Sequence, residues 1–348
     1  MRPKAIGNFA GAHHFALNSP YMYDITTNHY HMRADTLQPM VPFVIEGAEF
    51  DSSERAPPPR CHPGTRQDIM GAILAWRNNN SRAKRLLWLN GPAGIGKSAI
   101  IQTLAEAEAE AVSAGTGKLG ATLFISRSNE RNESNRVLAT IAYQLAVKDP
   151  TYRAYITERM TADPRILGKS MTEQFKLLIA QPFGELALQP PADEDHAWSI
   201  YLDGLDECNN EDAQCRLVEL IGAFVLQYPE APLVWIIASR PEKHLQDLFA
   251  REDIVPSFHQ VTIPVNSDEA CRDVERYLRT EFTKIKDKHP YLIPATCQWP
   301  TETQFLTLGC AASGLFIFAS TVVRFVDTNP APQINPMTQL KLVLALIK

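Results

Sequence analysis

The stretch LLWLNGPAGIGKSAII, from Leu86 to Ile101, decides the fold of this chain. Its first residues, up to Leu89, form an apolar run that is typical of a short buried strand. Residues 91–98 (GPAGIGKS) fit the pattern G-x-x-x-x-G-K-[ST] at every fixed position. An apolar helical pattern follows from Ile100 onward. Strand, glycine loop and helix together predict a phosphate-binding loop.

Each fixed residue of this pattern has a chemical reason. Glycines let backbone N–H groups turn inward around phosphate oxygens, and the start of the next helix adds its positive dipole end. Lys97 reaches the β- and γ-phosphates, and the Ser98 hydroxyl is a ligand for Mg²⁺. We expect the nucleotide to be bound by Gly91, Pro92, Ala93, Gly94, Ile95, Gly96, Lys97, Ser98 and Ala99. A glycine turn arising by chance is the alternative, and the flanking strand and helix argue against it.

A later apolar strand, Ser199 to Leu202, ends in the acidic sequence Asp203-Gly204-Leu205-Asp206-Glu207. An apolar strand that delivers an Asp at its end is the second half of a P-loop NTPase site, and Asp203 would hold Mg²⁺ directly or through water. Alone, the cluster could be a helix N-terminus, where acidic residues are favourable. The upstream phosphate loop favours the nucleotide interpretation.

Further strands are predicted at residues 121–126, 233–238 and 259–263. The second of these is followed by Ser239 and Arg240, and an arginine at that edge of an open α/β sheet faces the ligand crevice. The alternative is an arginine on the surface. The pattern as a whole predicts an α/β fold, a P-loop NTPase with a mostly parallel sheet flanked by helices.

Toward the end of the chain, alternating strands and helices give way to helices only. Ser267 can cap the first of them, the second extends from Gln304 to Val326, and the third from Gln339 to Ile347. We therefore expect an NTPase domain over residues 61–265 and a small, incomplete helical lid domain over residues 266–348.

Residues 1–60 are expected to be a poorly ordered tail and linker. The loosely alternating apolar residues between Phe15 and Ile25 could instead form a hairpin or a strand that pairs with another chain. His29 and His31 suggest a metal site only weakly, because no third ligand is near. The proline-rich residues 51–63 are typical of a linker.

The composition of the 348 residues is ordinary for a globular protein with room for two domains. A net charge of −5 gives no electrostatic reason to expect nucleic-acid binding. The six cysteines show no metal-ligand spacing, which indicates reduced thiols in a cytoplasmic protein. The N-terminus lacks a continuous apolar h-region, so we expect no signal peptide, and no apolar stretch is long enough to span a membrane.

Together, GPAGIGKSAI, IYLDGLDEC and WIIASRPE resemble the NACHT-type nucleotide-binding domain of the STAND class of signal-transduction NTPases. The nephrocystin-like N-terminal form, abundant in fungi, is the most similar variant. The lead-in CHPGTRQDIMGAILAW is similar as well, and so is the segment from Gly314 to Ala319, with Phe316 where related domains have a proline. The resemblance covers residues 60 to 330 or so.

This resemblance implies roles for individual residues. Asp206 and Glu207 would polarise the attacking water, and Arg240 would face the γ-phosphate. Thr65 and Arg66 would line the nucleotide pocket. The residues themselves also predict Thr65 to be the N-cap of a helix that reaches Trp76.

The implied function is an ATP-binding, slowly hydrolysing signalling switch, similar to those of innate immunity, whose ATP or ADP state with Mg²⁺ controls self-association. Related proteins usually continue into a winged helix and a repeat array, which this chain, ending at Lys348, does not contain. A truncated fragment, a non-hydrolysing scaffold and a P-loop phosphotransferase are the alternatives. The absence of an Asn-Lys-x-Asp motif argues against a G-domain GTPase, and the choice of base otherwise stays open.

Overall fold

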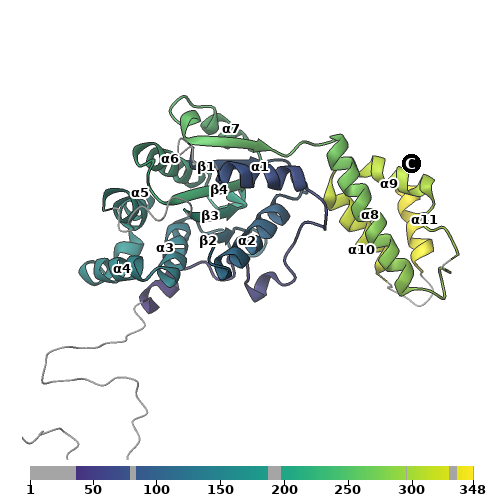
Figure 1. Cartoon of the computed structure of the whole chain (residues 1–348), viewed down its shortest axis with the longest axis horizontal. Helices are drawn as coiled ribbons and strands as arrows, with labels where there is room; N and C mark the ends of the chain where they lie inside the picture. The colour runs from purple at the N-terminus through teal and green to yellow at the C-terminus, as the bar shows by residue number, and fades with distance from the viewer. Residues whose placement is uncertain (1–36, 79–83, 187–196, 295, 329–334, 348) are drawn as a thin grey trace, which may run out of the picture.

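The computed structural model describes residues 37–78, 84–186, 197–294, 296–328 and 335–347. In these residues a parallel sheet with helices on both faces is followed by a separate group of four helices (Figure 1). The expectations for Phe15 to Ile25 and for His29 and His31 lie outside the described residues. Within the described part of the chain, no helix is both long and apolar enough to cross a membrane.

The sheet has five parallel strands in the order β2-β3-β4-β1-β5. Their bounds are β1 Leu86–Asn90, β2 Leu119–Phe124, β3 Trp198–Asp203, β4 Leu233–Ser239 and β5 Phe258–Thr262. All five strands predicted from the sequence are confirmed, with bounds that differ by at most two residues.

Alternation of side chains along the strands divides the core into two layers. In β1, Leu86 and Trp88 face one layer, and Leu87 and Leu89 face the other. The first layer packs mainly on α3 and α6, and the second on α1 and α2. Both faces of a parallel sheet are covered in this way, which explains the continuous apolar runs of the sequence.

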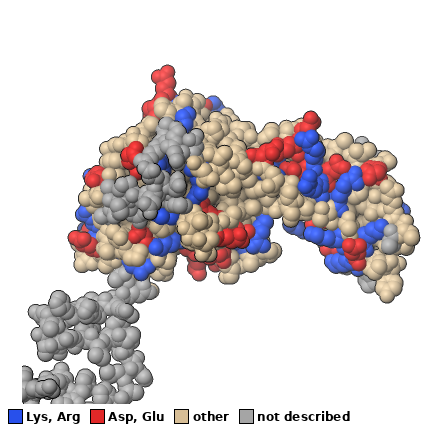
Figure 2. Space-filling view, in the orientation of Figure 1, with Lys and Arg blue, Asp and Glu red and all other residues tan. Residues whose placement is uncertain are grey.

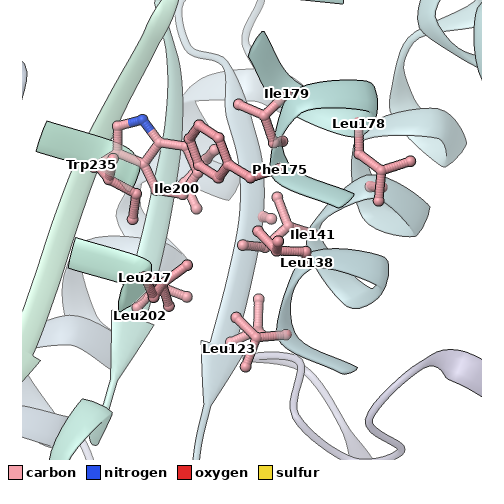
Figure 3. Close-up of a cluster of buried hydrophobic side chains, with 14 of the residues drawn as sticks. Leu123, Leu138, Ile141, Phe175, Leu178, Ile179, Ile200, Leu202, Leu217 and Trp235 are labelled. Atoms are coloured by element: carbon pink, nitrogen blue, oxygen red, sulfur yellow. The ribbon is translucent and has the colours of Figure 1, made fainter. Parts of the chain in front are cut away.

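The helices of this part are α1 Gln67–Arg77, α2 Lys97–Ser113, α3 Val137–Lys148, α4 Pro150–Ala162, α5 Met171–Phe175, α6 Glu211–Gln227 and α7 Lys243–Phe249. The 3₁₀ helices are η1 Gln38–Phe43, η2 Ser53–Arg55, η3 Ser134–Arg136, η4 Ile166–Gly168, η6 Leu205–Glu207 and η7 Val255–Ser257. The segment η5 Lys176–Glu185 is a π-helix. Figure 3 shows Trp235 of β4 beside Phe175 of α5, whose ring centroids lie 6.3 Å apart, in the first core layer.

Residues 37–60 were expected to belong to a poorly ordered tail and linker. In the structure they instead pack on the sheet domain. Met40 and Ile45 are buried in the first core layer. The Ile45 N–H donates to the Thr140 hydroxyl of α3 at 2.9 Å. These apolar residues are spaced irregularly and fill gaps between neighbouring elements, so they produce no period that the sequence could reveal.

The C-terminal helices are α8 Asp268–Lys288, α9 Glu302–Ala312, α10 Phe316–Asp327 and α11 Pro336–Ile347, and they share a core of their own. Ser267 caps α8 as predicted, with its hydroxyl accepting from the Ala270 N–H. The prediction of one helix from Gln304 to Val326 is wrong. Ser313 (φ 49°) and Gly314 (φ 77°) take left-handed conformations that end α9 and turn the chain into α10.

Candidate functional site

Three adjacent strands bring the predicted site residues to one edge of the sheet. In the order β3-β4-β1, Asp203 pairs in register with Ala238, and Ser239 pairs with Asn90. The strands are parallel, so the phosphate loop after β1, the acidic end of β3 and Arg240 after β4 all leave the sheet at this edge. This edge is where ligands bind in open α/β sheets.

A cavity of about 350 Å³ lies at this edge. Most of the predicted residues line it, namely Thr65, Arg66, Ala93, Gly94, Gly96, Lys97, Ser98, Ala99, Asp203, Asp206, Glu207 and Arg240. The remaining predicted residues support the loop from behind. Gly91 and Pro92 offer carbonyls to Lys97, and Ile95 is fully buried in the second core layer.

The phosphate loop has the geometry that its glycines predict. Gly94 (φ 74°) and Gly96 (φ 104°) occupy left-handed conformations, and Gly96 precedes the first residue of α2 without a capping side chain. The start of α2 can therefore offer N–H groups to an anion. The Lys97 ammonium donates to the carbonyls of Gly91 at 2.6 Å and Pro92 at 3.0 Å, and burial lowers its pKa.

Asp203 and Ser98 form an oxygen pair beside the loop. Asp203 is only 5% exposed, and burial raises its pKa from 3.8 to about 6, although a hydrogen bond with Ser98 acts in the opposite direction. Among the described residues no group of three or more His, Cys, Asp or Glu side chains gathers as a metal cage. A hydroxyl and a carboxylate nevertheless fit Mg²⁺, which takes hard oxygen ligands and completes its shell with phosphate oxygens and water.

Arg240 is paired with the two remaining acidic residues. Its backbone N–H donates to one Asp206 oxygen at 2.9 Å, and its Nε lies 3.3 Å from the other. Its Nη2 lies 3.8 Å from a Glu207 oxygen. The arginine and both carboxylates are therefore gathered at one wall of the cavity.

Arg127, just beyond β2, holds the acidic pair from the other side. Its N–H donates to Glu207 Oε2 at 3.0 Å, and its Nη2 donates to the Asp206 carbonyl at 3.1 Å. The sequence signal that could have placed Arg127 here was its position after a predicted strand, because β2 pairs in parallel with β3, whose end carries the acidic residues. The sequence had assigned Arg127 no role.

The prediction that Thr65 caps α1 is wrong. The Thr65 hydroxyl donates to the His62 carbonyl at 2.7 Å, within its own turn. Arg66 holds the N-cap position instead, with a left-handed backbone (φ 56°) and no capping side-chain bond. The Arg66 guanidinium donates to the carbonyls of Ile95 at 3.0 Å and Gly314 at 3.4 Å.

Most other cavity residues were missed because they lie in the expected linker or in the helical group, namely Pro59, Arg60, Cys61, His62, Tyr277, Phe316, Ile317 and Ser320. Gly204, which directly follows Asp203, also lines the cavity. The ring of Tyr277 on α8 packs edge-on against His62, with centroids 5.5 Å apart, and lies 5.8 Å from Phe316 of α10. These residues are more than 200 positions from His62, so no local pattern could have placed them together. On the face shown in Figure 2, acidic and basic side chains are interspersed over both parts of the molecule.

A parallel sheet with a glycine loop after β1 and an acidic end on β3 defines the P-loop NTPase fold. A family model described as Nephrocystin 3, N-terminal, matches residues 64–240, about half of the chain. The chain belongs to this family.

Similar solved structures include C. elegans PCH-2, with 14% identity over 81% of this chain and 68% of that one, and a TM-score of 0.41. Drosophila ORC bound to DNA has 14% identity over 95% of this chain and 71% of that one, with a TM-score of 0.41. A Walker-type ATPase of Pyrococcus abyssi has 13% identity over 76% of this chain and 73% of that one, with a TM-score of 0.37. No curated protein matches the chain. These structural similarities are weak, and the assignment depends on the family match and on the fold itself.

Proposed function

We propose that this chain is a NACHT/STAND-type switch that binds ATP or ADP with Mg²⁺ and hydrolyses ATP slowly. The observation that carries the proposal is the gathering of the loop, Asp203 and Arg240 around one cavity that the helical group also lines. In this proposal residues 61–265, with the packed segment 37–60, form the NTPase domain. Residues 266–348 form the lid.

The phosphates of the nucleotide would lie on the loop. Lys97 would exchange the carbonyls of Gly91 and Pro92 for phosphate oxygens, which are stronger partners for an ammonium. Ser98 and Asp203 would hold Mg²⁺, which neutralises phosphate charge when bound. Deprotonated Asp203 is the form suited to this, and a cation beside it would offset the cost of burying its charge.

Hydrolysis would depend on the acidic pair. The Glu207 carboxylate is oriented by the N–H of Arg127 and could polarise a water, while Arg240 would leave Asp206 to meet the γ-phosphate. A γ-phosphate therefore competes for Arg240 with a partner that is present without nucleotide. ATP, which has a γ-phosphate, would draw Arg240 away from Asp206, and ADP, which has none, would leave the pair in place.

The lid would respond because it contacts the loop directly. The Ile317 N–H of α10 donates to the Gly94 carbonyl at 3.1 Å, and Phe316 and Ser320 line the cavity. A nucleotide shifts the lid only if it binds the two lid positions with different affinity. Movement of the lid would then change a surface for self-association.

Nucleotide extracted from the purified chain and identified by chromatography tests the resting state, which we expect to hold ADP. Light scattering then compares the chain with ADP and with a non-hydrolysable ATP analogue, and a larger species with the analogue supports the switch. Equal size in both states would limit the chain to a static nucleotide-binding fold. The Lys97→Ala variant, which should respond to neither nucleotide, is the control.

A further inference from the structure

Arg66 lies at the junction of three segments that are far apart in the sequence. Its guanidinium donates to the Ile95 carbonyl of the phosphate loop and to the Gly314 carbonyl between α9 and α10. Its Cζ lies 5.0 Å from the centre of the Phe316 ring, a cation–π contact with the first residue of α10. One side chain therefore joins the loop to the lid.

The backbone of Arg66 is held just as firmly. Its N–H donates at 2.8 Å to a carboxylate oxygen of Asp273, which lies on α8. The residue is 2% exposed and has a left-handed conformation (φ 56°), which is uncommon outside glycine. Strained conformations persist where the surroundings determine them, and they cluster at ligand sites and switches.

Arg66 also has a hydrogen-bond donor that is free to take a new partner. It lines the cavity, and its buried Nε has no hydrogen-bond partner among the described residues. Buried donors without partners are costly, so such a group favours any rearrangement that supplies an acceptor. Lys97, by contrast, meets the loop carbonyls of Gly91 and Pro92 and makes no bond to the lid among the hydrogen bonds of the described residues.

We propose that Arg66 is the positioning residue through which the phosphate loop sets the position of the helical lid. This inference rests on the proposed function, because it needs a nucleotide on the loop. When the loop rearranges around phosphate, the Ile95 carbonyl moves with it, and Arg66 transmits the movement to Gly314 and Phe316. Arg66 was expected to line the nucleotide pocket, and besides lining the cavity its guanidinium donates to two backbone carbonyls.

The Ile317 N–H provides a direct readout of the lid position. As the second residue of α10 it has no acceptor within its own helix, and the Gly94 carbonyl protects it across the interface. Its hydrogen exchange therefore reports the contact between loop and lid. In the wild-type chain we expect ATP analogue and ADP to change this exchange rate by about tenfold, a common size for coupling between sites.

In Arg66→Met, measured at nucleotide concentrations that saturate the variant, we expect the exchange rate of the Ile317 amide no longer to differ between ATP analogue and ADP. Arg279→Met is the matched control, because Arg279 also lies over a phenylalanine ring, 4.7 Å from the centre of Phe305. Among the described residues its guanidinium bonds only to Glu275 and Glu302, both within the helical group. The control should keep the full response.

Phe316→Leu is a second, milder variant in case Arg66→Met does not fold, and it should reduce the response. A full nucleotide response in a folded Arg66→Met chain would overturn the inference, as would a full response in Phe316→Leu if Arg66→Met fails to fold. Binding of a fluorescent ATP analogue is measured in parallel for every chain. Absence of binding to the wild type would instead contradict the proposed function, so the two failures are distinguishable.

Discussion

A methyl group added at Gly94 would separate the lid from the phosphate loop. An ideal Cβ at this position would lie 2.2 Å from Ile317 Cγ2 and 2.6 Å from Ile317 Cβ. The Ile317 N–H is bonded to the Gly94 carbonyl, so α10 cannot move aside and keep this bond. Overpacking of this kind costs about 1–3 kcal/mol, and only while the lid is closed, which favours the open lid by roughly five- to 150-fold.

Gly94→Ala also forces a left-handed backbone on alanine, at about 1–2 kcal/mol, but this cost applies in both lid positions. Gly96→Ala separates the two effects. Gly96 is left-handed as well (φ 104°), and apart from the residue itself and its chain neighbours no described atom lies within 4 Å of its ideal Cβ. It therefore reproduces the backbone strain without the overlap.

Hydrogen exchange of the Ile317 amide without nucleotide is the assay, with circular dichroism to verify folding. In Gly94→Ala the exchange should accelerate by the same factor of roughly five to 150, and in Gly96→Ala it should stay close to the wild-type rate. Equal exchange rates in the two variants would show that α10 does not rest on Gly94, and the coupling reasoning would fail.

Burial raises the pKa of Asp203 from 3.8 to about 6, so the folded chain binds this proton more tightly than the unfolded chain, and stability falls as the pH rises through this window. Without nucleotide, Asp203→Asn should thus be up to roughly 3 kcal/mol more stable than wild type in urea unfolding at about pH 7, and no more stable than wild type at about pH 3.5. Equal stability of variant and wild type at both pH values would contradict the assigned cost of burying the charge. Asp203→Asn should weaken Mg²⁺-dependent nucleotide binding, while Glu207→Gln should bind nearly normally and hydrolyse ATP about a hundredfold more slowly or worse. Equal loss of binding in both variants would refute this division of roles. Met40→Ala should lower the free energy of unfolding by about 2–5 kcal/mol, because Met40 is fully buried. Val41→Ala should change it by less than about 0.5 kcal/mol, because the neighbouring Val41 is 46% exposed. Similar small effects would show that this segment is peripheral.

The sheet and the residues at its edge could be predicted because their signals are local. Lys97 and Ser98 lie in one continuous motif, and Asp203 directly follows an apolar strand. The parallel topology then brings these ends together without any further information from the sequence. For Arg240 as well, the position after a strand was sufficient.

The remaining parts depend on tertiary packing. Met40 is buried by surfaces that form only after α3 and the sheet have assembled, and its neighbours show no period. The turn at Gly314 lies between apolar residues at helical spacing, which masked the end of α9. Phe316 and Tyr277 reach the cavity because the helical group packs there, a placement that no local pattern encodes.

Binding of ATP with Mg²⁺ to the full chain, measured by titration calorimetry for wild type and Lys97→Ala, tests the central claim most directly. In the proposed function Lys97, which lines the cavity, would donate to a phosphate oxygen, and the loss of a charge-assisted hydrogen bond costs about 1.5–3 kcal/mol. The wild type should bind ATP, and a folded Lys97→Ala should bind at least about tenfold more weakly. No binding to the wild type, or equal affinity in the two chains, would contradict the account.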